Sequence, residues 1–352
     1  MKTIRMMTFI LTSFVAQSGE PLNMKELEQQ IADQELKSIT SVLIQHNQQL
    51  TYERYFNDHH EQSRHDMRSA SKSITSLAIG LAIDQGKLAG VKQQVMPFFS
   101  HKQPFENSDP RKEQITIEDL LTMSSVLECD DWNSASRGNE ERMYIIEDWT
   151  KFILDLPIRG IPPWKKKPID SPWGRTFSYC TGGVQVLTEL VERVAKQPMS
   201  QYLQKNLFSP LNIKAPLFSQ SPLGITNGGG GMQMTSRDWI KIGQLMLSDG
   251  RFEELQLIPA EWITQSFKPR AMIDESRQMS YGYLWWINQF ESDGQTITAF
   301  AAAGNGGNYL FIIPVLNATV VITSTAYNTP YMHQQSRSIL TQHVLPALLN
   351  RQ

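Results

Sequence analysis

The chain has little cysteine and no excess of either charge, and both absences narrow the classes of protein to which it can belong. Only two of its 352 residues are Cys, too few for a disulfide-built scaffold or a four-thiolate metal site. Its 33 Lys and Arg residues are balanced by 35 Asp and Glu residues, whereas proteins that bind nucleic-acid phosphates normally carry a basic excess. Hydrophobic residues make up 40% of the chain, enough for a large core. We therefore expect a globular enzyme without a nucleic-acid partner.

Several well-known site motifs are missing as well. There is no G-x-S-x-G sequence, so a nucleophile elbow of the α/β-hydrolase type is not supported. The glycine run at residues 228–231 lacks the Lys and the following Ser or Thr of a phosphate loop. His59, His60 and His65 lie in a polar loop without the spacing of metal ligands, and we interpret them as surface residues. We expect neither a metal nor a cofactor.

No apolar run reaches the roughly 20 residues that a membrane-spanning helix needs, so we expect no integral membrane segment. Residues 1–18 instead have the pattern of an export signal. Lys2 and Arg5 precede an apolar stretch, and Ala16 and Ser18 are small residues at a usable cleavage spacing. This pattern predicts a signal peptide and an exported protein, periplasmic or extracellular. The alternative is an amphipathic start on a cytoplasmic protein.

The hydrophobic pattern predicts strands near both ends of the chain and helices between them. A hairpin is expected over residues 39–56, and later strands are expected at 281–287, 297–302, 309–313 and 319–323. Helices are expected at 69–85, 117–123, 146–154, 183–194, 236–248 (with Ser236 as its cap) and 332–349. The pattern predicts one α/β sheet lobe built from residues 38–98 and 216–352, and a helical lobe formed by residues 99–215.

The clearest candidate for chemistry is an S-x-x-K sequence formed by Ser69 and Lys72, which occurs once in the chain. Residues three apart on a helix project on the same side. Burial lowers the pKa of a lysine, so Lys72 could accept the proton of the serine hydroxyl. Free N–H groups at the helix N-terminus suit a developing oxyanion. The alternative is an ordinary helix cap followed by a solvated lysine.

Two further segments support a catalytic interpretation of this sequence. Tyr179 is followed two residues later by the hydroxyl of Thr181, directly before an expected helix. A glycine-rich segment at residues 304–307 lies between two apolar strands, where backbone without side chains could approach a substrate closely. Taken alone, each of these segments is as well explained by a turn.

In this order, the three segments resemble the active-site signature of serine β-lactamase-like and penicillin-binding-protein-like hydrolases. The resemblance is strongest to the branch related to class C β-lactamases, which includes esterases, D-aminopeptidases and 6-aminohexanoate-dimer hydrolases. Further similarity lies at residues 117–125, 230–238 and 281–286, and the match extends from about residue 39 to residue 350. The resemblance implies an α+β, β-lactamase-like fold in which a mostly antiparallel sheet from both chain ends is flanked by helices, with an all-helical inserted lobe.

The resemblance also implies roles for the candidate residues. Ser69 would be the acylated nucleophile, Lys72 its proton-handling partner and Tyr179 a general base. The order of proton transfer between Lys72 and Tyr179 stays open, because such coupled groups titrate as a pair. The backbone N–H groups of Ser69 and Gly307 would form the oxyanion hole.

Two departures from the family pattern bear on the substrate. The family has an asparagine two residues after the tyrosine, where this chain has Thr181, and a cation at the position of Gly304 that pairs with a substrate carboxylate. Losing a charge-assisted partner costs on the order of 1.5–3 kcal/mol of recognition, so we expect an ester or amide substrate rather than an efficiently hydrolysed β-lactam. The expected substrate-binding residues are Thr181, Gly304, Asn305, Gly306 and Trp173.

The two cysteines lie close to this expected site. Cys180 adjoins Tyr179, and Cys129 follows the helix that lines the same cleft in the family. In an exported protein they could form a disulfide that braces Tyr179. The alternative is two separate buried thiols.

The sequence thus predicts a metal-independent serine hydrolase that acts on a small-molecule or peptide ester or amide. One alternative keeps the enzyme class and changes the substrate, giving a β-lactamase or a D,D-peptidase. The other is a non-catalytic protein that binds peptidoglycan or peptides in the same cleft. The exact substrate, the oligomeric state and the pathway are left open.

Overall fold

The computed structural model describes residues 22–160 and 176–351. The expected signal segment and Trp173 lie outside these residues. The described helices include none long and apolar enough to cross a membrane.

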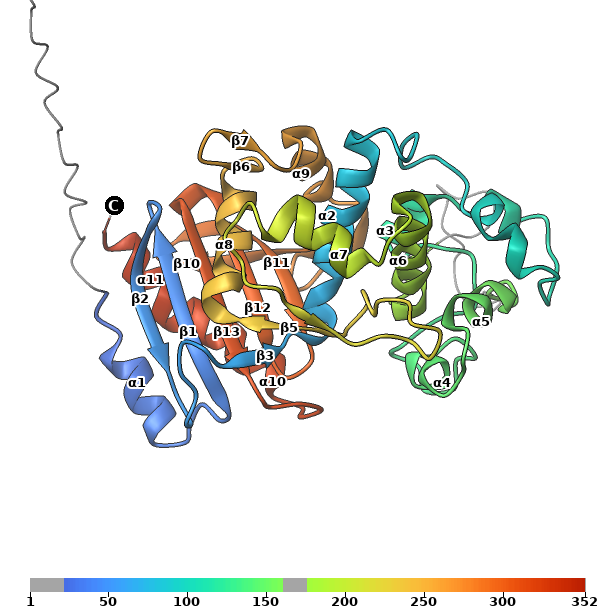
Figure 1. Ribbon diagram of the computed structural model, residues 1–352. Coiled ribbons are helices and arrows are strands. Elements are labelled where there is room, and N and C mark those ends of the chain that lie inside the picture. The colour runs from blue at the N-terminus through green and yellow to red at the C-terminus, as the bar shows by residue number, and fades with distance from the viewer. Residues whose placement is uncertain (1–21, 161–175, 352) are drawn as a thin grey trace, which may run out of the picture.

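An eight-stranded antiparallel sheet lies at the centre of the larger lobe, and strands from both ends of the chain lie side by side in it (Figure 1). The strand order is β2-β1-β13-β12-β11-β10-β9-β8. The bounds are β1 Ile39–His46, β2 Gln49–Tyr55, β8 Ala271–Asp274, β9 Met279–Tyr281, β10 Trp286–Ser292, β11 Gln295–Gly304, β12 Asn308–Ile313 and β13 Ala318–Ser324. The predicted α+β fold class is confirmed.

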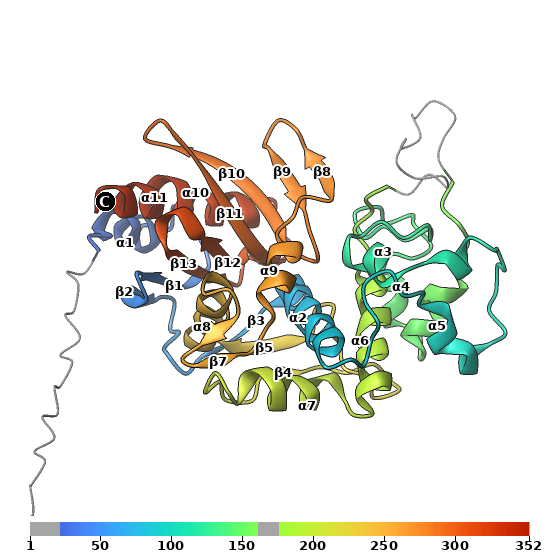
Figure 2. The same cartoon turned by 90° about the horizontal axis from the view of Figure 1, so that it is seen from above.

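Both faces of this sheet are covered, which explains why its central strands are apolar on both sides. The helices α1 (Lys25–Ala32), α10 (Met332–Ser338) and α11 (Leu345–Leu349) lie on one face, as Figure 2 shows. The other face carries α8 (Ser236–Leu247) and α2 (Ser71–Asp84). Successive residues alternate between the two cores: Phe311 packs toward α10 and α11, and Leu310 and Ile312 pack toward α8 and α2.

The helices of the middle segment lie on the side of α2 that faces away from the sheet (Figures 1 and 2). They are α3 Ile117–Leu121, α4 Glu140–Tyr144, α5 Trp149–Asp155, α6 Thr181–Ala195 and α7 Met199–Leu203. Within residues 99–160 and 176–215 the structure assigns no strand. The helix α2 is buried along almost its whole length because α6 contacts one side of it and β11 the other.

Short elements complete the chain and were not expected from its pattern. They are a three-stranded sheet of β3 (Arg64–Asp66), β5 (Met232–Thr235) and β4 (Leu217–Phe218), a hairpin of β6 (Arg251–Phe252) and β7 (Leu255–Gln256), and the helix α9 (Ala260–Ser266). The interpretation of His65 as a surface residue is wrong, because it lies in β3 and is buried beside Thr40.

Three expected elements differ in detail. The strand predicted at 281–287 is two strands, since β9 ends at Tyr281 and β10 begins at Trp286, with Leu284 in a left-handed turn between them. The cap of α8 is Thr235, whose hydroxyl accepts the N–H of Asp238, and not Ser236. The C-terminal helix includes a π-helical turn, Ile339–Val344, between α10 and α11.

Candidate active site

Ser69 lies in a 3-10 turn, Arg68–Ala70, that leads directly into α2. The α-helix itself begins at Ser71, two residues later than expected. Arg68 has a positive φ of 48°, a conformation that turns the chain sharply before the helix. This turn leaves Ser69 half-buried at the wall of a cleft, at the N-terminal end of a 14-residue helix.

Lys72 is fully buried beneath Ser69. Its Nζ lies 2.9 Å from Ser69 Oγ and 2.5 Å from the carbonyl oxygen of Gly229. Burial lowers the pKa of Lys72, and the carboxylates of Asp131 and Glu140 oppose that shift. The glycine run at 228–231 therefore has a role that its sequence did not suggest: its backbone supplies an acceptor that fixes the lysine.

Tyr179 approaches the same hydroxyl from the segment that precedes α6. Its phenol oxygen is hydrogen-bonded to the hydroxyl of Ser69, and its ring centroid lies 5.1 Å from Lys72 Nζ. Burial raises the pKa of Tyr179 well above its ordinary value, and the bond from Ser69 lowers it in part. The structure thus brings together a hydroxyl, a buried amine and a phenol from two distant parts of the chain.

Asp131 holds the Tyr179 segment in place, a role that sequence reasoning missed. Its backbone N–H donates to the carbonyl of Tyr179 at 2.8 Å, and its Oδ2 accepts the N–H of Thr181 at 2.6 Å. Its Oδ1 accepts the N–H of Glu140 at 2.9 Å. One carboxylate therefore caps the first turns of both α6 and α4.

The raised pKa of Asp131 can be tested through the pH dependence of protein stability. Burial, with the nearby Glu140, raises the pKa of Asp131 to about 6. The folded state therefore binds this proton more tightly than the unfolded state, so ionisation of Asp131 costs stability as pH rises. We expect the free energy of unfolding of the wild type, minus that of Asp131→Asn, to fall by about 2 kcal/mol between pH 4 and pH 6 and then to level off. Urea denaturation of both proteins across this range measures the difference; a rise or a flat line contradicts the assignment.

The end of β11 packs directly against the Ser69 turn. A Cβ at Gly304 would lie 2.1 Å from the carbonyl oxygen of Met67 and 3.1 Å from the N of Ala70. No side chain fits there, so the absence of a cation at this position is a consequence of close backbone approach. Asn305 follows in the cleft wall, where its Nδ2 donates to Oδ1 of Asn328 at 2.6 Å and its Oδ1 accepts the backbone N–H of Asn328 at 2.9 Å.

Three sequence-predicted residues do not line the cleft. The N–H of Gly307 donates to the carbonyl of Gly304 at 3.2 Å, so it is not free for an oxyanion, and that prediction is wrong. The N–H of Gly306 donates to the sulfur of Met332. Thr181 is completely buried at the first position of α6, so it cannot touch a substrate in the cleft.

Cys129 and Cys180 are joined by a disulfide with a Cα–Cα distance of 5.5 Å. The bond ties the loop of Asp131 to the residue after Tyr179, beside the hydrogen bonds already described. The segment that carries Tyr179 is therefore fixed both covalently and by hydrogen bonds.

The cleft has a volume of about 610 Å³ and runs from the α4 side of Ser69 to α10. Its walls include an aromatic cluster in which Trp132 stacks on Tyr179, with ring centroids 5.5 Å apart, and on Trp286. Trp132 is 62% exposed, which is unusual for a large aromatic side chain and typical of a ligand-contacting surface. Sequence reasoning also missed the polar lining residues Glu140, Glu141, Asn288, Tyr309, His333 and Arg337.

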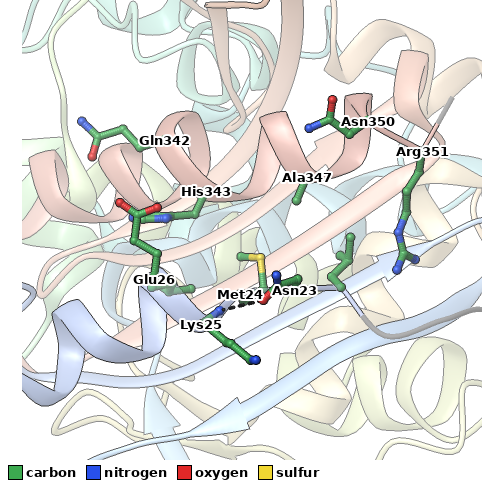
Figure 3. Close-up of a pocket in the computed structure, with 11 residues that line it drawn as sticks. Asn23, Met24, Lys25, Glu26, Gln342, His343, Ala347, Asn350 and Arg351 are labelled. Carbon is green, nitrogen blue, oxygen red and sulfur yellow. Dashed lines mark hydrogen bonds between the residues drawn. The ribbon is translucent and has the colours of Figure 1, made fainter.

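A larger hollow of about 680 Å³ lies between α1 and the C-terminal helix (Figure 3). Lys25, Glu26 and His343 line it, but none of its described lining residues is a serine, threonine or cysteine. No group of three His, Cys, Asp or Glu side chains in the described part of the chain could hold a metal ion. The cleft at Ser69, unlike this hollow, is lined by a hydroxyl that contacts a buried amine.

Comparison with known proteins agrees with this geometry. The sequence model of the Beta-lactamase family matches residues 25–343. The chain is 24% identical over 286 residues to the 6-aminohexanoate-dimer hydrolase of Paenarthrobacter ureafaciens, a match that covers 74% of this chain and 66% of that protein. The chain thus spans slightly less than two thirds of the length of the curated relatives it matches.

Solved structures show the same fold. A class C β-lactamase from Rhodobacter sphaeroides superposes with a TM-score of 0.62 at 14% identity, over 91% of this chain and 98% of that one. A D-stereospecific amidohydrolase from Streptomyces gives a TM-score of 0.65 at 12% identity, over 90% and 98% of the two chains. Because the family match covers most of the sequence, the chain belongs to the Beta-lactamase family of hydrolases.

Proposed function

We propose that this protein is a serine hydrolase that cleaves an ester or amide bond through an acyl-enzyme on Ser69. The observation that carries the proposal is the contact of one hydroxyl with two proton-handling groups: Lys72 Nζ at 2.9 Å and the phenol of Tyr179. A capping serine followed by a solvated lysine would leave the lysine exposed, whereas Lys72 is buried and held by a backbone carbonyl.

The pKa shifts of Lys72 and Tyr179 favour different roles for these two side chains in the proposed acylation of Ser69. Because burial lowers its pKa, Lys72 suits the proton acceptor; because burial raises its pKa, Tyr179 suits the proton donor. Ser69 Oγ forms a bond to the substrate carbonyl carbon as its proton passes to Lys72. The bond to the leaving group then breaks as Tyr179 protonates the departing oxygen or nitrogen, and Lys72 returns a proton to Tyr179. Water then takes the place of the leaving group and forms a bond to the acyl carbon, giving a proton to Tyr179 as the phenol passes its own proton to Lys72. The bond between the acyl carbon and Ser69 Oγ breaks as Lys72 returns a proton to Oγ, and the acid is released.

Two backbone donors beside Ser69 suit the oxyanion of this reaction. One is the N–H of Ser69 at the start of α2, where the helix dipole adds partial positive charge. The other is the N–H of Asn305, which follows the close contact of Gly304 with the Ser69 turn and has no hydrogen-bond acceptor among the described residues. We propose Asn305 in this role in place of Gly307.

Ester or amide substrates are favoured over β-lactams. Gly304 cannot carry the cation that the family pattern uses for the β-lactam carboxylate, because no side chain fits beside Met67. The relatives known as a 6-aminohexanoate-dimer hydrolase and a D-stereospecific amidohydrolase support an amide or a related ester. We also propose export of the protein, which the disulfide supports because such bonds persist in oxidising compartments.

Covalent labelling tests the proposed nucleophile. After reaction with a fluorophosphonate probe, peptide mass spectrometry should find one adduct, on Ser69, in the wild type and none in Ser69→Ala. Ser71→Ala is the matched control, since its hydroxyl donates to the carbonyl of Arg68 and should not be needed for labelling. An adduct that persists in Ser69→Ala would show that another residue is the nucleophile.

A further inference from the structure

The α10 end of the cleft contains a cation without an ionic partner. The guanidinium of Arg337 lines the same cleft as Ser69, and it forms no ion pair with any carboxylate in the described part of the chain. Its contact is a hydrogen bond that it donates to the hydroxyl oxygen of Tyr309. Arginine presents a planar fork of donors, and one neutral oxygen leaves most of that fork unused.

The neighbours of Arg337 do not neutralise its charge. The Tyr309 hydroxyl also pairs with Nδ1 of His333 at 3.0 Å. Burial lowers the pKa of His333 to about 4, with a further contribution from Arg337, and burial raises the pKa of Tyr309 to about 12. Both side chains are therefore uncharged near pH 7, and Arg337 keeps a net positive charge in the cleft.

A second donor without a partner belongs to a residue that lines the same cleft. Asn288 is only 7% exposed and lines the cleft, yet its Nδ2 has no hydrogen-bond partner among the described residues. A buried amide donor that is left unpaired costs free energy, and ligand binding is one way to recover it.

Strand register places these groups on one face of the sheet. Asn288 on β10 lies opposite Ala299 on β11, and Ala303 lies opposite Tyr309 on β12. Side chains alternate along a strand, so positions 299, 301 and 303 share the face of Asn288 and Tyr309. All three are alanines; Ala303 lines the cleft together with Asn288 and Tyr309, whereas Ala299 and Ala301 are fully buried.

The opposite end of the cleft is acidic. Asp131, Glu140 and Glu141 line it on the side of α4, and they would repel an anion there. An anionic group on a bound substrate is therefore directed toward α10. A multiply charged phosphate suits this acidic cleft less well than a carboxylate, whose two oxygens match the fork of one arginine.

We propose that Arg337 and Asn288 form a subsite for a carboxylate carried by the substrate, so that the hydrolase acts on esters or amides of carboxylate-bearing molecules. This inference rests on the proposed function at Ser69 and adds the substrate class. The cation of this subsite comes from α10, and not from the position of Gly304, where the family pattern has the cation that pairs with a β-lactam carboxylate.

Matched substrate pairs test the subsite. One pair carries the charge on the leaving group, 4-(butanoyloxy)benzoate against 4-(butanoyloxy)benzamide; the other carries it on the acyl group, mono-4-nitrophenyl glutarate against the 4-nitrophenyl ester of glutaramic acid. In at least one pair the wild type should prefer the carboxylate by about tenfold or more in kcat/KM, as a charge-assisted pair predicts. Arg337→Gln should reduce that preference at least tenfold, Asn288→Ala should reduce it less, and Arg337→Lys should restore part of it.

A control and a binding measurement complete the experiment. Arg251→Gln removes an exposed cation from β6 and should leave the preference unchanged. Calorimetry with the Ser69→Ala protein should show the same Arg337-dependent preference in binding. No preference in either pair, or a preference that survives Arg337→Gln, overturns the subsite. If Arg337-dependent binding appears without any Ser69-dependent hydrolysis, the subsite stands and the proposed hydrolase function fails.

Discussion

Ser69→Ala and Lys72→Met are each expected to lower kcat by about 10⁴-fold or more, and the double variant should be no slower than the worse single variant. The reason is the 2.9 Å contact between Lys72 Nζ and Ser69 Oγ, which makes the two side chains one functional unit. Without the amine the hydroxyl keeps its proton, and without the hydroxyl the amine has nothing to activate. Steady-state kinetics with one activated ester and one anilide measure all three variants.

Lys112→Met is the matched control for the loss of a buried lysine. Lys112 is also fully buried, and its Nζ donates to the carbonyl oxygens of Glu106 and Asn107, away from Ser69. Its replacement should lower stability without lowering kcat. If the effects of Ser69→Ala and Lys72→Met multiply in the double variant, the two residues act independently and the proposed unit is wrong.

The sequence was sufficient to find Ser69 and Lys72 as candidates, because their spacing and local apolar pattern are properties of one contiguous segment; Tyr179 was added by the resemblance to the family. A lysine three residues from a serine shares its helix side wherever the helix lies. A helix that is apolar all round must be buried, so its first turn is at the edge of the core. The alternation of apolar residues likewise predicted most strands of the large sheet.

The residues that were missed depend on packing between distant segments. Nothing in the local sequence of Asp131 shows that it accepts the N–H of Thr181, 50 residues away. The assignment of Gly307 to the oxyanion hole failed because the turn after β11 bonds back on itself, and only the register of β11 with β12 shows this. The sequence likewise did not predict Arg337 as a cleft residue, because Arg337 reaches the cleft through the packing of α10 against β12, the strand of Tyr309.

Tyr179 could either remove the proton from Ser69 or protonate the leaving group. Its pKa is raised by burial and by the carboxylates of Asp131 and Glu140, so the phenol holds its proton near neutral pH. A group in that state suits protonation of a leaving group better than removal of the proton from Ser69. The two roles differ in what they predict for substrates with different leaving groups.

Tyr179→Phe should therefore lower kcat/KM by about 10²–10⁴-fold for an anilide or an alkyl ester, whose leaving groups need a proton. The loss should be within about tenfold for a 4-nitrophenyl ester, because nitrophenolate departs without one. Lys72→Met should slow both substrates alike, since each needs an activated Ser69. Tyr202→Phe removes a phenol bonded to Gln85, far from Ser69, and controls for the loss of a buried hydroxyl. Equal losses for both leaving groups in Tyr179→Phe would instead make the phenol the base that activates Ser69.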